Sequence, residues 1–218
     1  MARLVHANDR ALLVVFDDAI TVAAGNEVRA LYEWLLEDAP EAIVDLHPAY
    51  SSLLIRYDPL RCEPDVLARE IDRRVENLSG RPLRESRLFE IPVRYGGFHG
   101  PDLAEVARFT GLSERDVVAA HAGGAYDVRF VGFSPGFPYL GGLPEQLHTP
   151  RRETPRTQVS AGSVAIAGAQ AGIYPLRSPG GWNVIGWTDF VLFDSTRGNP
   201  ATLAPGDRVR FIDAGSGS

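Results

Sequence analysis

The sequence predicts an α+β protein with two domains, a ferredoxin-like α/β sandwich over residues 1–82 and a β-rich domain over residues 83–218. Three observations support this prediction. Apolar residues in the first part recur at strand and helix spacings in the order β-α-β-β-α. Residues 79–83, Ser-Gly-Arg-Pro-Leu, have the composition of a linker. Residues 129–188 hold ten of the 22 glycines and seven of the 16 prolines between short apolar runs, which is typical of short strands joined by tight turns.

The first domain is expected to contain three strands and two helices. Asn26 precedes the apolar spacing of the first helix and is its expected N-cap. The second and third strands flank a Pro-Ala-Tyr-Ser turn and therefore predict a β-hairpin. A further strand near residues 87–93 either completes the ferredoxin-like sandwich or begins the second domain. The expected strands are 11–16, 42–47 and 52–57, and the expected helices are 26–37 and 65–78.

The second domain is expected to begin with two short helices, over residues 102–110 and 113–122, before a run of strands from residue 125 onward. Ser113 is the expected N-cap of the second helix. Asp102, with Glu105 three residues later, forms a capping-box pattern, which assigns Asp102 to its helix end rather than to chemistry. Many short strands with regular turn signals predict a closed or strongly bent antiparallel sheet.

Composition excludes several classes of function. The net charge of −6 opposes the basic stripe of a nucleic-acid-binding protein. The 22 cationic residues are all arginine, so any phosphate must meet arginine or backbone N–H groups. Cys62 is the only cysteine, and His6, His47 and His148 have no ligand-like spacing, so neither a disulfide nor a metal is expected. No apolar run approaches the roughly 20 residues that cross a bilayer, and no signal peptide is evident, which predicts a soluble cytoplasmic protein.

The glycine- and proline-rich segments predict a pocket for a substrate. In residues 130–142 aromatic residues alternate with glycine and proline, so the chain bends sharply beside surfaces that bury large rings. Residues 178–182, Ser-Pro-Gly-Gly-Trp, are expected to face this segment. The predicted substrate-binding residues are Phe133, Pro135, Gly136, Phe137, Tyr139, Gln170, Ser178, Gly180, Gly181 and Trp182.

Three residues between positions 129 and 188 need separate consideration. Ser134 fits a Gly-x-Ser-x-Gly pattern, but the proline after it lacks the N–H that an oxyanion hole needs, so Ser134 is not a nucleophile. Gln170 either contacts a ligand or stabilises its own turn. Trp182 stacks on a ligand, fills the core or anchors a partner chain.

Two residues are candidates for catalysis. His121 ends the second short helix, where it is either a general base or substrate partner, or a capping or packing residue. Arg151, Arg152 and Arg156 lie in a proline-stiffened segment that either clamps a carboxylate or phosphate or remains solvated. Arg156 is the first choice among the three, because it lies between a rigid turn and the entry of a strand.

Five strings occur in one order along the chain: Gly-Phe-Ser-Pro-Gly-Phe-Pro-Tyr-Leu at 132–140, Thr-Pro-Arg at 154–156, Ala-Gly-Ser-Val at 161–164, Gly-Ile-Tyr-Pro at 172–175 and Ser-Pro-Gly-Gly-Trp at 178–182. They resemble the 5-oxoprolinase B-subunit family, which is also labelled KipI-like and allophanate hydrolase subunit 1. The resemblance implies a cyclophilin-like β-barrel for residues 83–218. At Phe98 and His99 the chain departs from the family, which usually carries an acidic residue and a tyrosine there; this weakens a catalytic role for both.

The resemblance also implies a function and its partners. It indicates one component of an ATP-dependent 5-oxoprolinase, acting with a paralogous C-type subunit and a hydrolytic A-type subunit, with ATP bound by this chain or elsewhere in the complex. The chain lacks a complete catalytic set, so a composite site at a subunit interface and no activity of the lone chain are expected. The alternatives are a KipI-like inhibitor that binds a sensor histidine kinase and a urea-carboxylase-like subunit that handles a small amide.

Overall fold

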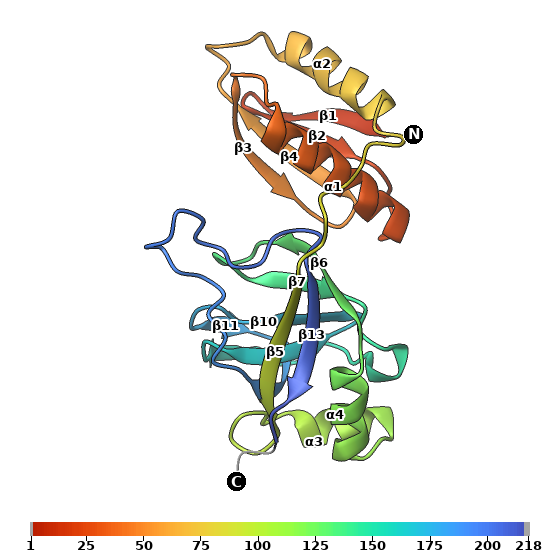
Figure 1. The fold of residues 1–218 in the computed structure, drawn as a ribbon, viewed down its shortest axis with the longest axis vertical. Coiled ribbons are helices and arrows are strands. Elements are labelled where there is room, and N and C mark those ends of the chain that lie inside the picture. The colour runs from red at the N-terminus through yellow and green to blue at the C-terminus, as the bar shows by residue number, and fades with distance from the viewer. Residues whose placement is uncertain (1, 216–218) are drawn as a thin grey trace. The chain divides into compact units, whose positions relative to one another are not determined.

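The computed structural model describes residues 2–215, and the chain divides into two compact units, Met1–Glu85 and Ser86–Ser218 (Figure 1). The predicted division lies between residues 82 and 83. Among the described residues, no helix combines the length and the apolar character needed to cross a membrane.

The first unit is a four-stranded antiparallel sheet with two helices. The strands lie in the order β1-β2-β4-β3. Leu12 pairs with Ile55 and Val14 with Leu53, so these four side chains point to one face of the sheet. That face shares one apolar core with residues of both helices. The elements are β1 (Arg3–Asn8), β2 (Ala11–Val15), α1 (Val22–Glu37), β3 (Ile43–Pro48), β4 (Ser52–Tyr57) and α2 (Pro64–Glu76).

The order of elements in this unit differs from the predicted ferredoxin-like arrangement, which is not confirmed. The edge position beside β2 is occupied by β1, a strand that the sequence reading missed, and the strand near 87–93 belongs to the second unit. The predicted N-cap of the first helix is also wrong. Thr21 caps α1 by accepting a 3.1 Å hydrogen bond from the backbone of Ala24, and Asn26 lies within the helix. Buried Ala24 begins the apolar face one turn earlier than the larger side chains suggest.

The second unit is a closed seven-stranded barrel in the order β10-β7-β6-β13-β5-β12-β9, which fits the cyclophilin-like barrel that was expected. A separate pair, β8 and β11, forms a small second sheet. The strands are β5 (Leu88–Tyr95), β6 (Tyr126–Val131), β7 (Pro138–Gly141), β8 (Arg156–Val159), β9 (Ser163–Ala167), β10 (Gln170–Ile173), β11 (Ser178–Gly180), β12 (Asn183–Trp187) and β13 (Arg208–Asp213).

The barrel is antiparallel except at one pair, a feature that the sequence reading did not anticipate. β5 and β13, its first and last strands, run parallel and side by side from Leu88 beside Arg208 to Val93 beside Asp213 (Figure 1). Arg87 forms an ion pair with the fully buried carboxylate of Asp207 immediately before these two strands. The same carboxylate accepts a 2.9 Å hydrogen bond from the backbone of Ala204. Burial and pairing at this point hold the two strand ends in register.

Two helices, α3 (Leu103–Thr110) and α4 (Glu114–Ala122), lie at one end of the barrel, and a 3₁₀ turn spans Glu145–Leu147 (Figure 1). Ser113 caps α4 as predicted, since its side chain accepts a 3.1 Å hydrogen bond from the backbone N–H of Asp116. Asp102 does not cap α3 through its side chain, contrary to the capping-box prediction. Its carboxylate instead accepts hydrogen bonds from Arg152, Arg156 and the backbone of Val184.

Candidate functional site

Six of the ten predicted substrate-binding residues line an aromatic pocket of about 230 Å³. They come from two separate segments, as expected, and Tyr174 joins them from the end of β10. The lining residues are Phe133, Phe137, Tyr139, Arg151, Pro155, Tyr174, Pro179, Gly180, Gly181 and Trp182.

The floor of this pocket is a set of rings packed edge to face. The ring of Phe137 lies at centroid distances of 5.0 Å from Tyr139, 5.2 Å from Tyr174 and 5.6 Å from Trp182. Phe137, Tyr174 and Trp182 are buried and form an apolar cluster separate from the main barrel core. Trp182 is only 5% exposed, which favours its core alternative over that of an exposed partner anchor.

Phe133 stands at the rim of the pocket in a strained conformation. Its φ of 67° is the one positive value among the non-glycine residues that the structure describes. Left-handed backbone is unfavourable for a bulky residue, and such strain concentrates at functional sites. The Phe133 side chain is 64% exposed, although its ring contacts Phe137 at a centroid distance of 5.5 Å. An exposed aromatic ring held this way is available to cover a ligand.

Gly180 brings the backbone close to Tyr174. A Cβ added to Gly180 would lie 2.3 Å from the Tyr174 hydroxyl oxygen, so no larger residue fits without displacing the ring. Burial raises the pKa of Tyr174, and a hydrogen bond from the backbone of Trp182 opposes that rise. The hydroxyl of Tyr174 therefore remains protonated and fixed beside the Gly180 backbone.

A larger cleft of about 850 Å³ adjoins the aromatic pocket. Arg151 lines both cavities and therefore marks their shared border. Four arginines and three carboxylates surround the cleft, which leaves it a formal charge of +1. Its charged residues are Asp102, Glu105, Arg108, Arg151, Arg152, Glu153 and Arg156, and its polar residues are Thr149, Thr154 and Asn183.

Asp102 forms ion pairs with two of these arginines. Its carboxylate is 3% exposed and pairs with Arg156 through two hydrogen bonds, of 2.7 and 2.8 Å. Arg152 donates a third hydrogen bond of 2.6 Å, and the backbone N–H of Val184 donates a fourth of 2.7 Å. The hydrogen bond to Asp102 raises the pKa of Arg156. The guanidinium of Arg156, the preferred ligand clamp of the sequence reading, is thus engaged by a side chain of the protein itself.

Arg151 is the cation that remains available. Its guanidinium carbon lies 6.0 Å from the ring centroid of Trp182, at the limit of cation–π contact. Within residues 2–215 it forms no ion pair with a carboxylate. Burial raises the pKa of Tyr139, and the positive charge of Arg151 acts against this rise. The site therefore offers an aromatic floor with one unneutralised guanidinium at its edge.

His121 lies outside this site. Its imidazole is fully buried among Tyr95, Tyr126 and Phe211, with Nδ1 2.8 Å from the Tyr95 hydroxyl oxygen. Burial lowers its pKa to about 3, so the ring is neutral at ordinary pH. A general base must reach a proton of the substrate, and this ring is closed off from solvent. The structure favours the packing alternative for His121.

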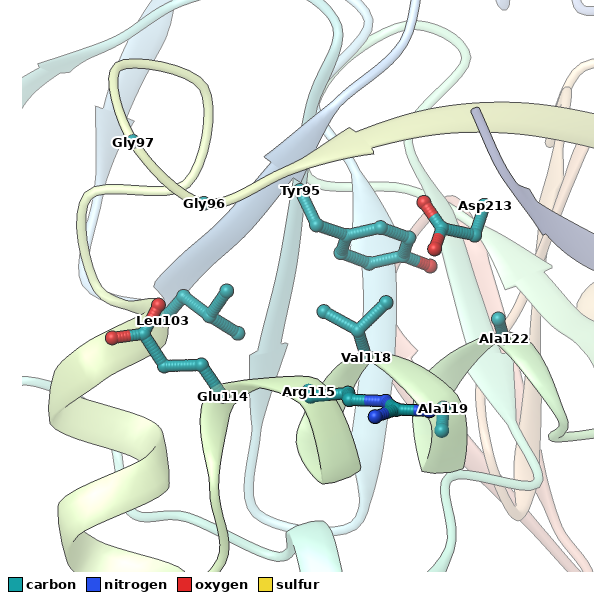
Figure 2. A pocket seen from close by; sticks show the side chains of 10 residues that line it. All are labelled: Tyr95, Gly96, Gly97, Leu103, Glu114, Arg115, Val118, Ala119, Ala122 and Asp213. Atoms are coloured by element: carbon teal, nitrogen blue, oxygen red, sulfur yellow. The ribbon is translucent and has the colours of Figure 1, made fainter. Parts of the chain in front are cut away.

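Tyr95 also lines a further cavity of about 430 Å³ (Figure 2). Leu103 from α3 and Val118 from α4 form its apolar wall, and the hydroxyl end of Tyr95 points toward Asp213 (Figure 2). None of the predicted site residues lines this cavity. The aromatic pocket and the arginine cleft are therefore the stronger candidate site.

Four predicted residues lie away from the pocket lining. Pro135 is exposed on its turn, and Gly136 is buried against the backbone and side chain of Leu192 and Phe193. Ser178 pairs with Val159 in the small sheet, and Gln170 opens β10 opposite Ala167. These residues shape the chain around the pocket without lining it.

Sequence reasoning missed two residues that the geometry makes central. Asp102 was assigned to a helix cap, because nothing local to it reveals arginines some 50 positions away. Tyr174 lies in the string at residues 172–175 and was not among the predicted site residues; its position between an apolar strand and a proline is the signal that could have found it. No group of three or more His, Cys, Asp or Glu side chains in the described part of the chain is arranged to hold a metal ion.

Comparison with known proteins places this site in a family context. The family model "Carboxyltransferase domain, subdomain C and D" matches residues 2–203. The chain is 44% identical to the 5-oxoprolinase B-subunit of Escherichia coli O157:H7 over 214 residues, covering 97% of this chain and 95% of that protein. It is 36% identical to the 5-oxoprolinase B-subunit of Bacillus subtilis (strain 168) over 214 residues, covering 94% of this chain and 89% of that protein.

Solved structures share the fold. The crystal structure of TTHA0988 superposes with a TM-score of 0.83 at 42% identity, covering 96% of this chain and 40% of TTHA0988. This chain therefore spans less than half the length of TTHA0988. The Kluyveromyces lactis urea carboxylase superposes with a TM-score of 0.77 at 19% identity, covering 98% of this chain and 22% of that enzyme. At that identity the likeness concerns the fold alone.

Proposed function

The chain belongs to the 5-oxoprolinase B-subunit family, and we propose that it is one component of an ATP-dependent 5-oxoprolinase, which opens the lactam 5-oxo-L-proline to L-glutamate. In this proposal the aromatic pocket and the bordering Arg151 form this chain's part of a composite site that binds and activates the amide. The observation that carries the proposal is the position of one unneutralised guanidinium beside a small aromatic cavity.

The cavity suits a ligand of this kind in size and in chemistry. At about 230 Å³ it is smaller than the roughly 300–1,000 Å³ of pockets for drug-sized ligands, so it suits a single small ring. The faces and edges of Phe137 and Trp182 would pack against the methylene groups of a five-membered lactam. Arg151 would pair with its carboxylate in a charge-assisted hydrogen bond. Phe133, exposed at the rim, would cover the bound ring.

Activation of the lactam requires charge to be stabilised on the amide oxygen, and this chain supplies only part of the means. Arg151 lines the site, whereas a general base at substrate distance is missing from the described residues of the pocket. We therefore assign the remaining groups to the paralogous C-type and hydrolytic A-type partners. A cleft with a formal charge of +1 is poorly matched to a triphosphate, so we place the ATP phosphates elsewhere in the complex.

Steady-state kinetics of the reconstituted complex test this proposal. Arg151→Gln should raise KM for 5-oxo-L-proline by about tenfold or more, because a charged hydrogen bond to the substrate is lost. Arg177→Gln is the matched control, since Arg177 is exposed and lines neither the pocket nor the cleft. The lone chain should show no turnover. Unchanged KM in Arg151→Gln, or full activity of the lone chain, would remove the proposed role.

The same complex distinguishes the alternative functions. A KipI-like inhibitor should bind a sensor histidine kinase with no lactam turnover in any mixture with partner subunits. A urea-carboxylase-like subunit should support turnover with urea in place of 5-oxo-L-proline. The fold likeness to urea carboxylase is shared by all three functions and favours none of them.

A further inference from the structure

The carboxylate of Asp102 is saturated with hydrogen-bond donors. Each of its oxygens accepts two hydrogen bonds, Oδ1 from Arg152 and Arg156 and Oδ2 from Arg156 and the backbone of Val184. A carboxylate has about four lone-pair sites, so no acceptor capacity remains. The group is also 3% exposed, and it therefore faces its donors rather than the solvent of the cleft.

The donors around Asp102 form the arrangement of an anion receptor. Two guanidinium groups and one backbone N–H converge on a single position, which is the usual geometry for recognition of phosphate or carboxylate. Both arginines keep about 30% of their side-chain surface open, with Arg152 at 31% and Arg156 at 28%. An anion from the cleft would reach them if Asp102 were absent.

The segment that carries these arginines is held in place independently of Asp102. The backbone N–H of Arg152 donates a 2.8 Å hydrogen bond to the carbonyl of Gly181, and the Asn183 side chain donates one of 2.8 Å to the carbonyl of Pro150. Neighbouring Pro150 and Pro155 restrict the backbone further. The two guanidinium groups are therefore preorganised, and their availability depends on what neutralises them.

We propose that Asp102 is a specificity-determining residue that acts as a built-in anion: it occupies the receptor formed by Arg152 and Arg156 and leaves Arg151 as the only cation that the described residues of the site offer to a ligand. The site then selects a ligand with a single carboxylate and rejects phosphate and other multivalent anions. This inference rests on the proposed function for the identity of the monocarboxylate, but not for the rejection of phosphate.

Titration of the full chain with inorganic phosphate tests the role of Asp102. Asp102→Ala should bind phosphate at least about tenfold more tightly than the unaltered chain, because two preorganised guanidinium groups become available. Formate, which has the shape of the missing carboxylate, should raise the melting temperature of Asp102→Ala and leave that of the unaltered chain unchanged. Asp102→Ser, which shortens the side chain and removes the charge, serves for the same phosphate titration if the alanine variant does not fold.

Glu105→Ala is the matched control. It removes one negative charge from the same cleft, but the donors to Glu105 come from a single exposed guanidinium, that of Arg108. Its phosphate affinity should remain within about twofold of the unaltered chain. An equal gain in Glu105→Ala and Asp102→Ala, or tight phosphate binding by the unaltered chain, would overturn the inference.

Competition separates this inference from the proposed function. Phosphate should displace 5-oxo-L-proline from Asp102→Ala and not from the unaltered chain. If the unaltered chain binds no 5-oxo-L-proline alone or in the complex, the proposed function fails, whereas the phosphate comparison still decides whether Asp102 occupies the receptor.

Discussion

The hydroxyl oxygen of Tyr95 lies 2.8 Å from Nδ1 of His121, and this is the one hydrogen bond of the imidazole within residues 2–215. The other ring nitrogen is buried with no partner in that part of the chain. A second proton on this ring would place a charge in an apolar core, which explains the low pKa of His121.

This burial predicts a pH dependence of stability. The pKa of His121 falls from 6.5 to about 3 on folding, so between these values the unfolded chain binds the proton and the folded chain does not. The stability that comes from keeping His121 neutral is fully present above pH 6.5, and it is lost as the pH falls toward 3. From pH 6.5 to pH 5 the free energy of unfolding should drop by about 2 kcal/mol through this residue.

Urea unfolding of the chain and of His121→Phe at several pH values measures the effect. The difference in unfolding free energy between the unaltered chain and His121→Phe should change by about 2 kcal/mol from pH 6.5 to pH 5. All other titrating groups are present in both proteins, so their effects cancel. Tyr95→Phe is the control: it removes the hydroxyl, keeps the imidazole buried and should retain the pH dependence of the unaltered chain. Parallel curves for His121→Phe and the unaltered chain would show that the ring is not held neutral by burial.

Truncation of Trp182 should mainly destabilise the lone chain. Its ring is 5% exposed and packs on Phe137 and Tyr139, so Trp182→Ala should cost about 3–5 kcal/mol of unfolding free energy. Trp187→Ala, at a half-buried position with one hydrogen bond to the Ala161 carbonyl, should cost about 1 kcal/mol. Unaltered melting of Trp182→Ala together with lost partner association would restore the interface alternative.

The close approach at Gly180 predicts a contrast between two neighbouring glycines. In Gly180→Ala the new methyl group would meet the Tyr174 hydroxyl, displace the ring and weaken 5-oxo-L-proline binding by about tenfold or more. In Gly181→Ala the nearest atom, on Pro155, lies at an ordinary 3.5 Å. Calorimetric titration of the reconstituted complex compares the two, and equal affinities would mean that Tyr174 does not shape the site.

The ion pair at the start of the parallel strands should matter more than its exposed counterpart. Asp207 is fully buried and accepts hydrogen bonds from half-exposed Arg87 and from the backbone N–H of Ala204, so Asp207→Ala should cost about 1–3 kcal/mol because the N–H of Ala204 loses its acceptor. Glu90 and Arg210 also link β5 and β13, but both are about half exposed, and Glu90→Ala should cost below about 1 kcal/mol. Chemical denaturation of both variants checks the ranking.

The sequence predicted most elements and much of the pocket because those features depend on local signals. Glycine and proline punctuation beside Phe133 and Phe137 indicated a bent, aromatic wall, and the structure places both rings in one cavity. Helical spacing placed α2, α3 and α4 to within about two residues. Sequence patterns therefore predict those features that are determined by residues close to one another in the chain.

Two of the missed features depend on partners that are distant in the sequence, and a third lacks a local signal. The role of Asp102 is set by arginines 50 and 54 positions away, and a local capping pattern concealed it. The strand β1 is mostly exposed, so it lacks the apolar alternation of a half-buried strand. The parallel pairing of β5 with β13 joins segments about 120 residues apart, which no local periodicity can reveal.

The placement of β13 between β5 and β6 also sets an order for folding during synthesis. Until β13 has left the ribosome, the facing edges of β5 and β6 have no neighbour, and unpaired edges invite association with other chains. The sheet of the first unit needs no strand from the second and is free to form earlier. Closure of the barrel is thus a late, long-range step, and nascent chains that stall before β13 should be the species that aggregate or recruit chaperones.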